Sequence, residues 1–186
     1  MKSKVRYITY TAMFLALAVL FQSLRTFVPI LEATAIFGPF SLASLIVGSL
    51  VNLCLILAAV RVGFWSGAAV SVLSTIVAFM QGHLPAALPQ MIAVVSVGNT
   101  VIVAVAWSLR KVGYPIAFYL GAVAKSLALW GMVTLIVVPF FSSNEAMTAL
   151  LSRLAVMFSW PQIVTGVIGA SLALAIAPAL AKSSKE

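Results

Sequence analysis

The sequence predicts an all-α integral membrane protein with six transmembrane helices in one compact bundle. Of its 186 residues, 63% are hydrophobic and 8% are charged, and the mean hydropathy is +1.20. A water-soluble domain of this composition would have nothing to cover its surface. The apolar residues fall into runs of roughly 20, the length at which a helix crosses ~30 Å of hydrocarbon. Basic residues cluster at the ends of these runs, where they set topology.

We predict a single membrane domain over residues 1–186, because the polar turns between the apolar runs are short. The predicted spans are about 7–28, 40–60, 63–81, 90–109, 114–138 and 160–180, with an interfacial helix at about 145–159. The basic N-terminus resembles the start of a signal peptide. However, the apolar run behind it is too long and no small-residue cleavage pattern follows, so we interpret it as a retained first span.

The first span carries Ala12 and Ala16, one helical turn apart. Small residues at this spacing let another helix approach closely, which replaces the missing hydrophobic drive in a bilayer. Packing inside the protein's own bundle is the alternative. The following stretch, Pro29–Pro39, holds Glu32 and is too polar and too broken to span, so we predict an ordered loop outside the membrane.

The second and third spans offer no catalytic or metal-binding pattern. Asn52 lies inside the second span, and the third is rich in serine and small residues, which predicts burial between helices. The loop after it holds the only histidine, His83, which has no second ligand for a metal. Cys54 is the only cysteine, so no internal disulfide can form.

The fourth and fifth spans carry the most informative polar residues. The turn between them, residues 110–113, is so short that the two helices must lie antiparallel, which brings Asn99 and Lys125 to a similar depth. A lysine at mid-membrane costs about 2.5–3.5 kcal/mol on insertion scales and usually faces a cavity or a partner. We expect Lys125 to donate to a bound solute or to Asn99. A lysine that only snorkels or steadies the bundle is the alternative.

The last apolar run, from Ala146 to about Leu180, is too long for one straight span. Pro161 is predicted to divide it into an interfacial piece carrying Arg153 and a sixth span. Six spans put both termini on one side of the membrane. Eight basic residues fall on that side: Lys2, Lys4, Arg6, Arg61, Arg110, Lys111, Lys182 and Lys185.

Only Arg25 and Arg153 fall near the other side, so the excess of Lys and Arg predicts that both termini are cytoplasmic. The same distribution argues against nucleic acid as the reason for the net charge of +8. The loops at Pro29–Pro39, 82–89 and 139–144 are then external and form the expected ligand mouth.

Self-contained catalysis is not expected from this chain. It has no Asp, and Glu32 and Glu145 are loop residues, so paired carboxylates inside the membrane are missing. No nucleophile elbow, P-loop or zinc-protease motif occurs. We therefore predict neither an enzyme nor a protein with a metal or cofactor. What remains is binding and passage of a small polar or aromatic solute.

Taken together, these features resemble the substrate-binding S-component of energy-coupling-factor (ECF) vitamin transporters. The resemblance covers almost the whole chain and rests on six short spans, basic cytoplasmic ends, the Ala12 and Ala16 face, the extended first outer loop, Gly98-Asn99 and Lys125. It implies a multi-pass protein of a prokaryotic plasma membrane. It also implies a coupling transmembrane subunit and two cytoplasmic ATPase subunits as partners, with Ala12 and Ala16 meeting the coupling subunit.

The resemblance further implies a pocket for a vitamin or precursor in the outer half of the bundle. The matching candidates are Glu32, Asn99, Lys125, Trp130, Trp160 and Gln162. Two other classes stay open from the residues alone. One is a self-sufficient secondary transporter or channel with Lys125 as a gating charge. The other is a structural membrane subunit without a ligand.

Overall fold

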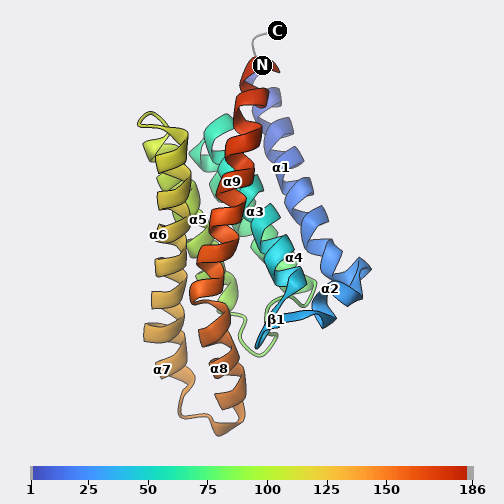
Figure 1. Ribbon diagram of the computed structural model, residues 1–186, viewed down its shortest axis with the longest axis vertical. Coiled ribbons are helices and arrows are strands. Elements are labelled where there is room, and N and C mark those ends of the chain that lie inside the picture. The colour runs from blue at the N-terminus through green and yellow to red at the C-terminus, as the bar shows by residue number, and fades with distance from the viewer. Residues whose placement is uncertain (1, 184–186) are drawn as a thin grey trace.

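Six apolar helices account for most of the protein in its computed structural model, which describes residues 2–183 (Figure 1). The elements are α1 (Lys2–Phe27), α2 (Pro29–Ala33), β1 (Ala35–Phe37), β2 (Phe40–Ser41), α3 (Leu42–Arg61), α4 (Phe64–Met80), α5 (Met91–Leu109), α6 (Tyr114–Met132), the π-helix η1 (Val133–Val137), α7 (Val138–Phe141), the 3₁₀-helix η2 (Glu145–Met147), α8 (Thr148–Met157) and α9 (Trp160–Ser183).

The predicted all-α membrane class is confirmed, and the count of six spans is approximate. Within the described residues, five helical stretches are long and apolar enough to cross a membrane, whereas α4 has only 17 residues. Where each helix enters and leaves the bilayer stays a prediction, as does the single-domain organisation. Lys185, one of the predicted cytoplasmic residues, lies outside the described part of the chain.

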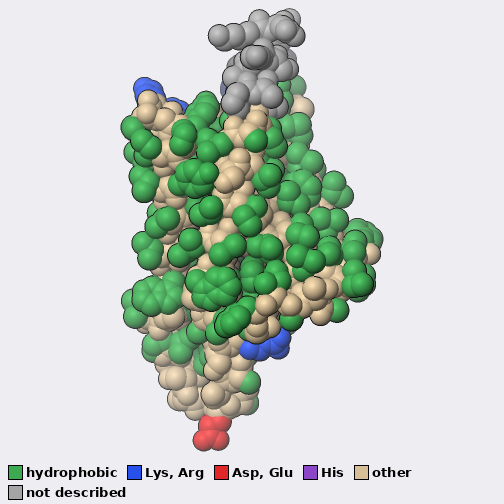
Figure 2. All heavy atoms as spheres, in the orientation of Figure 1, with side chains coloured by type: hydrophobic (Ala, Val, Ile, Leu, Met, Phe, Trp, Pro, Cys, Tyr) green, Lys and Arg blue, Asp and Glu red, His purple; other side chains and the backbone are tan. Residues whose placement is uncertain are grey.

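The start of α1 and the end of α9 lie at one end of the bundle, together with the turn between α5 and α6 (Figure 1). The β-hairpin and the connection between α7 and α8 lie at the opposite end, which we call the hairpin end. Hydrophobic side chains cover most of the visible flank of the bundle. Basic groups lie at the upper edge and also low on the flank, above an acidic group at the lower tip (Figure 2). An apolar flank of this kind suits contact with lipid.

Helix α3 forms the centre of the bundle. It contacts α1, α4, α5 and α9, and 72% of its most apolar stretch is buried, against 17% for α1. Small residues permit this crowding. A Cβ placed on Gly169 of α9 would lie 2.6 Å from the Cβ of Asn52 and 2.7 Å from the backbone oxygen of Ser49. Only glycine fits there, so α3 and α9 cross at close range.

Helices α5 and α6 are antiparallel neighbours, as the short turn predicted. Gly98 of α5 lies against Leu129 of α6, and Gly121 of α6 lies against Ile102 of α5. Asn99 follows Gly98, and Lys125 precedes Leu129 by four residues, which is about one helical turn. The two polar residues therefore lie at a similar level of the bundle.

The first connection is more structured than the predicted loop. Helix α2 leads into a two-stranded antiparallel hairpin that pairs Ala35 with Ser41 and Phe37 with Phe40. The chain turns at Gly38, whose φ of 52° is a conformation that glycine adopts at no steric cost. The side chain of Ser41 then accepts a hydrogen bond from the backbone N–H of Ser44 and caps α3.

The helix of the predicted fifth span continues past residue 138, where the span was predicted to end. Helical structure continues from Tyr114 to Phe141 through the π-turn of η1. Proline lacks the backbone N–H that an α-helix needs, and a π-turn just before it is one way to accommodate the missing bond. Helix α8 packs against this extension through Leu151 and Leu154.

Candidate functional site

A cavity of about 150 Å³ lies between the helices in the half of the bundle nearer the hairpin. Helices α1, α3, α4, α5, α6, α8 and α9 contribute to its walls, together with β2 and the loop after α4. Its polar lining consists of Gln22, Arg25, Ser44, Thr75, His83, Asn99, Lys125, Gln162 and Thr165. Apolar residues, among them Phe40, Val51, Leu129 and Phe158, fill the spaces between these groups.

Lys125 lies at the inner part of this cavity. Its side chain is 5% exposed, and its Nζ donates a hydrogen bond of 2.6 Å to Oδ1 of Asn52 on α3. The expected contact with Asn99 is not present, because the lysine stem reaches across to the central helix instead. The Nδ2 of Asn99 donates to the Thr75 hydroxyl at 3.3 Å. Both predicted residues nevertheless line the same cavity.

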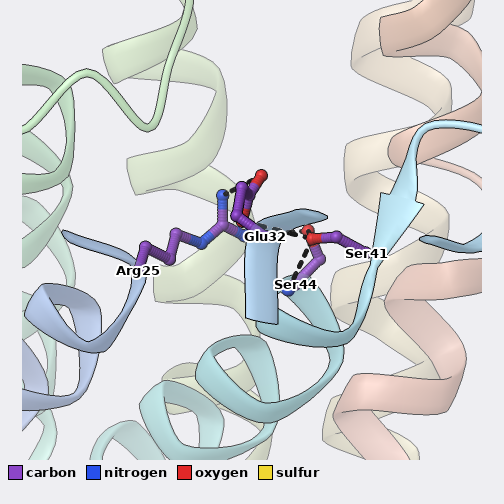
Figure 3. A network of polar contacts seen from close by, with 4 residues as sticks. All are labelled: Arg25, Glu32, Ser41 and Ser44. Atoms are coloured by element: carbon purple, nitrogen blue, oxygen red, sulfur yellow. Dashed lines mark hydrogen bonds and ion pairs between the residues drawn. The ribbon is translucent and has the colours of Figure 1, made fainter. Parts of the chain in front are cut away.

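The other end of the cavity is organised by Arg25 at the end of α1 (Figure 3). Its Nη2 donates to the Ser44 hydroxyl at 3.0 Å, and its Nη1 lies 3.9 Å from Oε1 of Glu32 on α2. The Ser41 hydroxyl donates to Oε2 of Glu32 at 3.2 Å. This network joins α1, α2, β2 and the N-terminus of α3 in one place, so the first connection is fixed over the cavity.

Three polar atoms of the lining are buried without a partner in the described structure: Oε1 of Gln22, Nε of Arg25 and Nε2 of His83. Buried polar atoms are nearly always paired with protein or water, so a group of unpaired ones around one cavity marks a place where a solute or water completes the bonding. Burial, together with the charge of Arg25, lowers the pKa of His83 below its usual value, although Glu32 opposes the effect. A lowered pKa keeps the imidazole neutral near neutral pH.

Of the six residues that the sequence singled out for binding, Asn99, Lys125 and Gln162 line the cavity. Glu32 does not, but it pairs with Arg25, which does. Trp160 is 43% exposed and packs edge-on against Phe37 and Phe40 of the hairpin. Trp130 is 47% exposed on α6 and does not line the cavity.

Sequence reasoning left Gln22, Arg25, Ser44 and Thr75 out of the candidate binding residues and gave His83 no ligand role. Gln22 could have been found, since an amide inside an apolar span carries the same signal as Asn99. Asn52 carried that signal too. Ser44 and His83 gave no such signal, because a serine at the start of a span and a histidine in a loop are ordinary features. Only the packing of the hairpin and of the α4–α5 loop brings them to the cavity.

Among the described residues there is no group of three or more His, Cys, Asp or Glu side chains that could hold a metal ion. The Cys54 thiol is buried within α3 and is free. The helices and the cavity thus define a multi-pass membrane protein built around a polar, solute-sized site.

Residues 6–181 match the family described as "ECF transporter, substrate-specific component". This match covers nearly the whole chain, and the protein belongs to that family. No curated protein and no solved structure matches it.

Membership confirms the resemblance drawn from the sequence and decides several broad questions. Substrate-specific components are binding subunits of transporters and not enzymes, and ATP hydrolysis resides in partner subunits. The protein is therefore a multi-pass membrane subunit that associates with components of an ECF module.

Proposed function

We propose that the protein binds a small water-soluble vitamin or vitamin precursor and serves its ATP-driven uptake across a prokaryotic plasma membrane. The observation that carries this proposal is the cavity itself, with polar groups from three directions: Asn99 of α5, Lys125 of α6 and Gln162 of α9. Polar groups that fix orientation, spaced by apolar walls, are typical of small-molecule sites. Family membership supplies the transport context.

In this proposal Asn99, Lys125 and Gln162 contact the ligand. Glu32 acts through Arg25, and Trp160 acts by holding the hairpin. Trp130 leaves the proposed site because its ring is exposed on α6 and lies outside the cavity lining. The exposed ring suits a membrane-facing position.

We place both termini in the cytoplasm and the hairpin end outside, so the cavity receives its ligand from the exterior. The excess of basic residues near the termini supports this orientation. At the end of the bundle that holds the termini, the Arg61 guanidinium donates to the backbone oxygen of Ala177. This contact ties α3 to α9 away from the cavity.

The proposed partners are a coupling transmembrane subunit and two cytoplasmic ATPase subunits, and the proposed contact on this chain is the Ala12 and Ala16 face. Both alanines are exposed in the bundle, whereas Ala18 of the same helix is fully buried. Exposed small residues one turn apart leave room for a helix from another chain.

The test is reconstitution. Small molecules that copurify with the detergent-solubilised protein are identified by mass spectrometry and then offered to proteoliposomes. We expect uptake only when the coupling subunit and both ATPases are present with ATP. Uptake by the protein alone, driven by a gradient, would make it a secondary carrier. Absence of any bound molecule would make it a structural subunit.

A further inference from the structure

The charge of the cavity lining is one-sided. Arg25 and Lys125 contribute two cations, and no carboxylate lies among the lining residues. The whole chain has only three acidic residues. Among the described acidic residues, Glu32 is the one near the cavity, where its half-exposed carboxylate accepts from Ser41 and lies beside Arg25. The carboxylate of Glu32 is therefore already paired with Arg25 and Ser41 at the hairpin end.

Lys125 has no such counter-charge. Within residues 4–177, the Arg25–Glu32 contact is the ion pair that the structure contains, and the ammonium of Lys125 meets only the neutral oxygen of Asn52. An ammonium has three N–H donors, so one acceptor leaves it incompletely paired although it is almost fully buried. Burying a charge is expensive unless an opposite charge or further hydrogen bonds compensate.

The two cations lie at different levels. Arg25 bonds to Ser44 and Lys125 bonds to Asn52, both on α3. These partners are eight residues apart, which is about 12 Å along a helix. Apolar side chains, among them Val47, Val51 and Leu129, line the part of the cavity between them. One compact anion cannot contact both cations, but an elongated molecule can.

We infer that the ligand is an organic monoanion whose carboxylate pairs with Lys125, whose apolar body lies along Val47, Val51 and Leu129, and whose neutral polar end meets Gln22 and Arg25. This inference rests on the proposed function and narrows its substrate class. The unpaired Oε1 of Gln22 and Nε of Arg25 supply one acceptor and one donor for that polar end. The carboxylate supplies the acceptors that the ammonium lacks.

The decisive experiment compares carboxylic acids with their own amides, because each pair differs in charge and hardly in shape. Benzoate and benzamide match nicotinate and nicotinamide in size and lack only the polar ring nitrogen, and biotin and biotin amide form a larger and longer pair. Thermal unfolding of the full chain in detergent is measured with each compound at millimolar concentration, and sodium sulfate serves as the inorganic control. A ligand that binds the native state raises its melting temperature.

We expect at least one acid to stabilise the protein with about tenfold higher affinity than its amide, the ratio that a hydrogen bond to a charged group supplies. The inference is overturned if no acid stabilises the protein, if an amide does so equally well, or if sulfate reproduces the effect of the acids. These wild-type measurements decide the question without any variant.

Variants then locate the charge. Lys125→Met should reduce the preference for acid over amide to near one, whereas Lys111→Met, which removes an exposed lysine, should leave it unchanged. Where Lys125→Met does not accumulate, Lys125→Gln replaces it. The assignment to Lys125 is overturned if the preference for acid persists in the residue 125 variant but is lost in Arg25→Gln. That result would place the carboxylate beside Arg25.

The outcome is separable from that of the proposed function. ATP-driven uptake of a neutral or cationic molecule would support the proposed transport function and contradict the inference that the ligand is an anion. Strong binding of an acid that is never transported would support the anionic ligand and contradict the proposed transport function.

Discussion

Lys125 of α6 and Asn52 of α3 form the polar contact that crosses the centre of the bundle, with Nζ donating to Oδ1 at 2.6 Å. Asn52 is fully buried, and its own Nδ2 has no partner in the described structure. Lys125 is therefore held by a group that is itself only half satisfied. Removing either residue leaves the other as a buried polar group without its hydrogen-bond partner, which is a cost to the stability of the fold.

The first prediction concerns this dependence. Asn52→Leu should destabilise the protein by about 1–3 kcal/mol, because it leaves the ammonium without its acceptor. Lys125→Met should cost less or even stabilise, since it removes an incompletely paired charge. The double variant should be more stable than Asn52→Leu alone. Melting curves of the unmodified protein, the two single variants and the double variant in detergent give the coupling energy between the two residues. Strictly additive effects would show that the contact contributes nothing to stability.

The second prediction concerns the crossing of α3 and α9. Gly169→Ala should destabilise by about 1–3 kcal/mol, because its methyl group would meet the Asn52 Cβ and the Ser49 backbone oxygen, and backbone cannot yield as a side chain can. Gly131→Ala is the matched control, since a Cβ at that position of α6 meets nothing within 4 Å. The control should be neutral or slightly stabilising. Equal losses in both variants, by thermal unfolding, would refute the close crossing.

The sequence predicted the fold better than the site, for a physical reason. Span length and hydropathy are local properties, so the apolar runs and the short turn at residues 110–113 could be recognised directly. The direction of a side chain in a bundle depends on which helix fills the neighbouring space. Lys125 points to Asn52 because α3 occupies the centre of the bundle. The spacing of residues within α6 does not indicate which helix Lys125 will face.

The first connection depends on tertiary packing in the same way. The sequence predicted an ordered loop over Pro29–Pro39, but the contact of Arg25 with Glu32 depends on how the hairpin folds back over α3. Trp130 and Trp160 were both reasonable candidates as aromatic residues near a predicted pocket. Neither ring lines the cavity: Trp130 is exposed on α6, and Trp160 packs on the hairpin.

The third prediction tests the Ala12 and Ala16 face. Ala12→Trp or Ala16→Leu should abolish copurification with the coupling subunit and lower transport, because both positions are exposed and added bulk separates two helix backbones. Ligand binding and melting temperature of the isolated protein should persist. Ala18→Leu is the contrast, since Ala18 is fully buried and added bulk there should lower the stability of the isolated protein. Loss of binding in Ala12→Trp would mean that the face packs internally.

The fourth prediction concerns orientation. In a Cys54→Ser background, single cysteines at Ser3 and Ser183 should resist an impermeant thiol reagent in intact cells, because the basic excess places both termini inside. A cysteine at Ser143, in the connection between α7 and η2, should react as the external control. Labelling of both terminal cysteines from outside would invert the topology and put the cavity on the cytoplasmic side.

The fifth prediction follows from His83, whose pKa is lowered chiefly by burial and further by Arg25. The unfolded chain then takes up a proton at a higher pH than the folded protein does. Stability is accordingly complete above the ordinary histidine pKa of about 6.5 and falls as the pH drops below it toward the folded pKa. Melting temperatures measured across this range should decline on the acid side, and His83→Gln should lessen the decline.

Because His83 is the only histidine in the chain, its titration can be followed directly by NMR of histidine-labelled protein after removal of any affinity tag. Arg25→Gln should move the His83 pKa upward, since it removes a nearby positive charge, and Glu32→Gln should move it downward. Opposite shifts from the two variants would establish that the histidine senses the Arg25–Glu32 contact. A His83 pKa at or above the ordinary value in the unmodified protein would contradict its half-buried position beside the cavity.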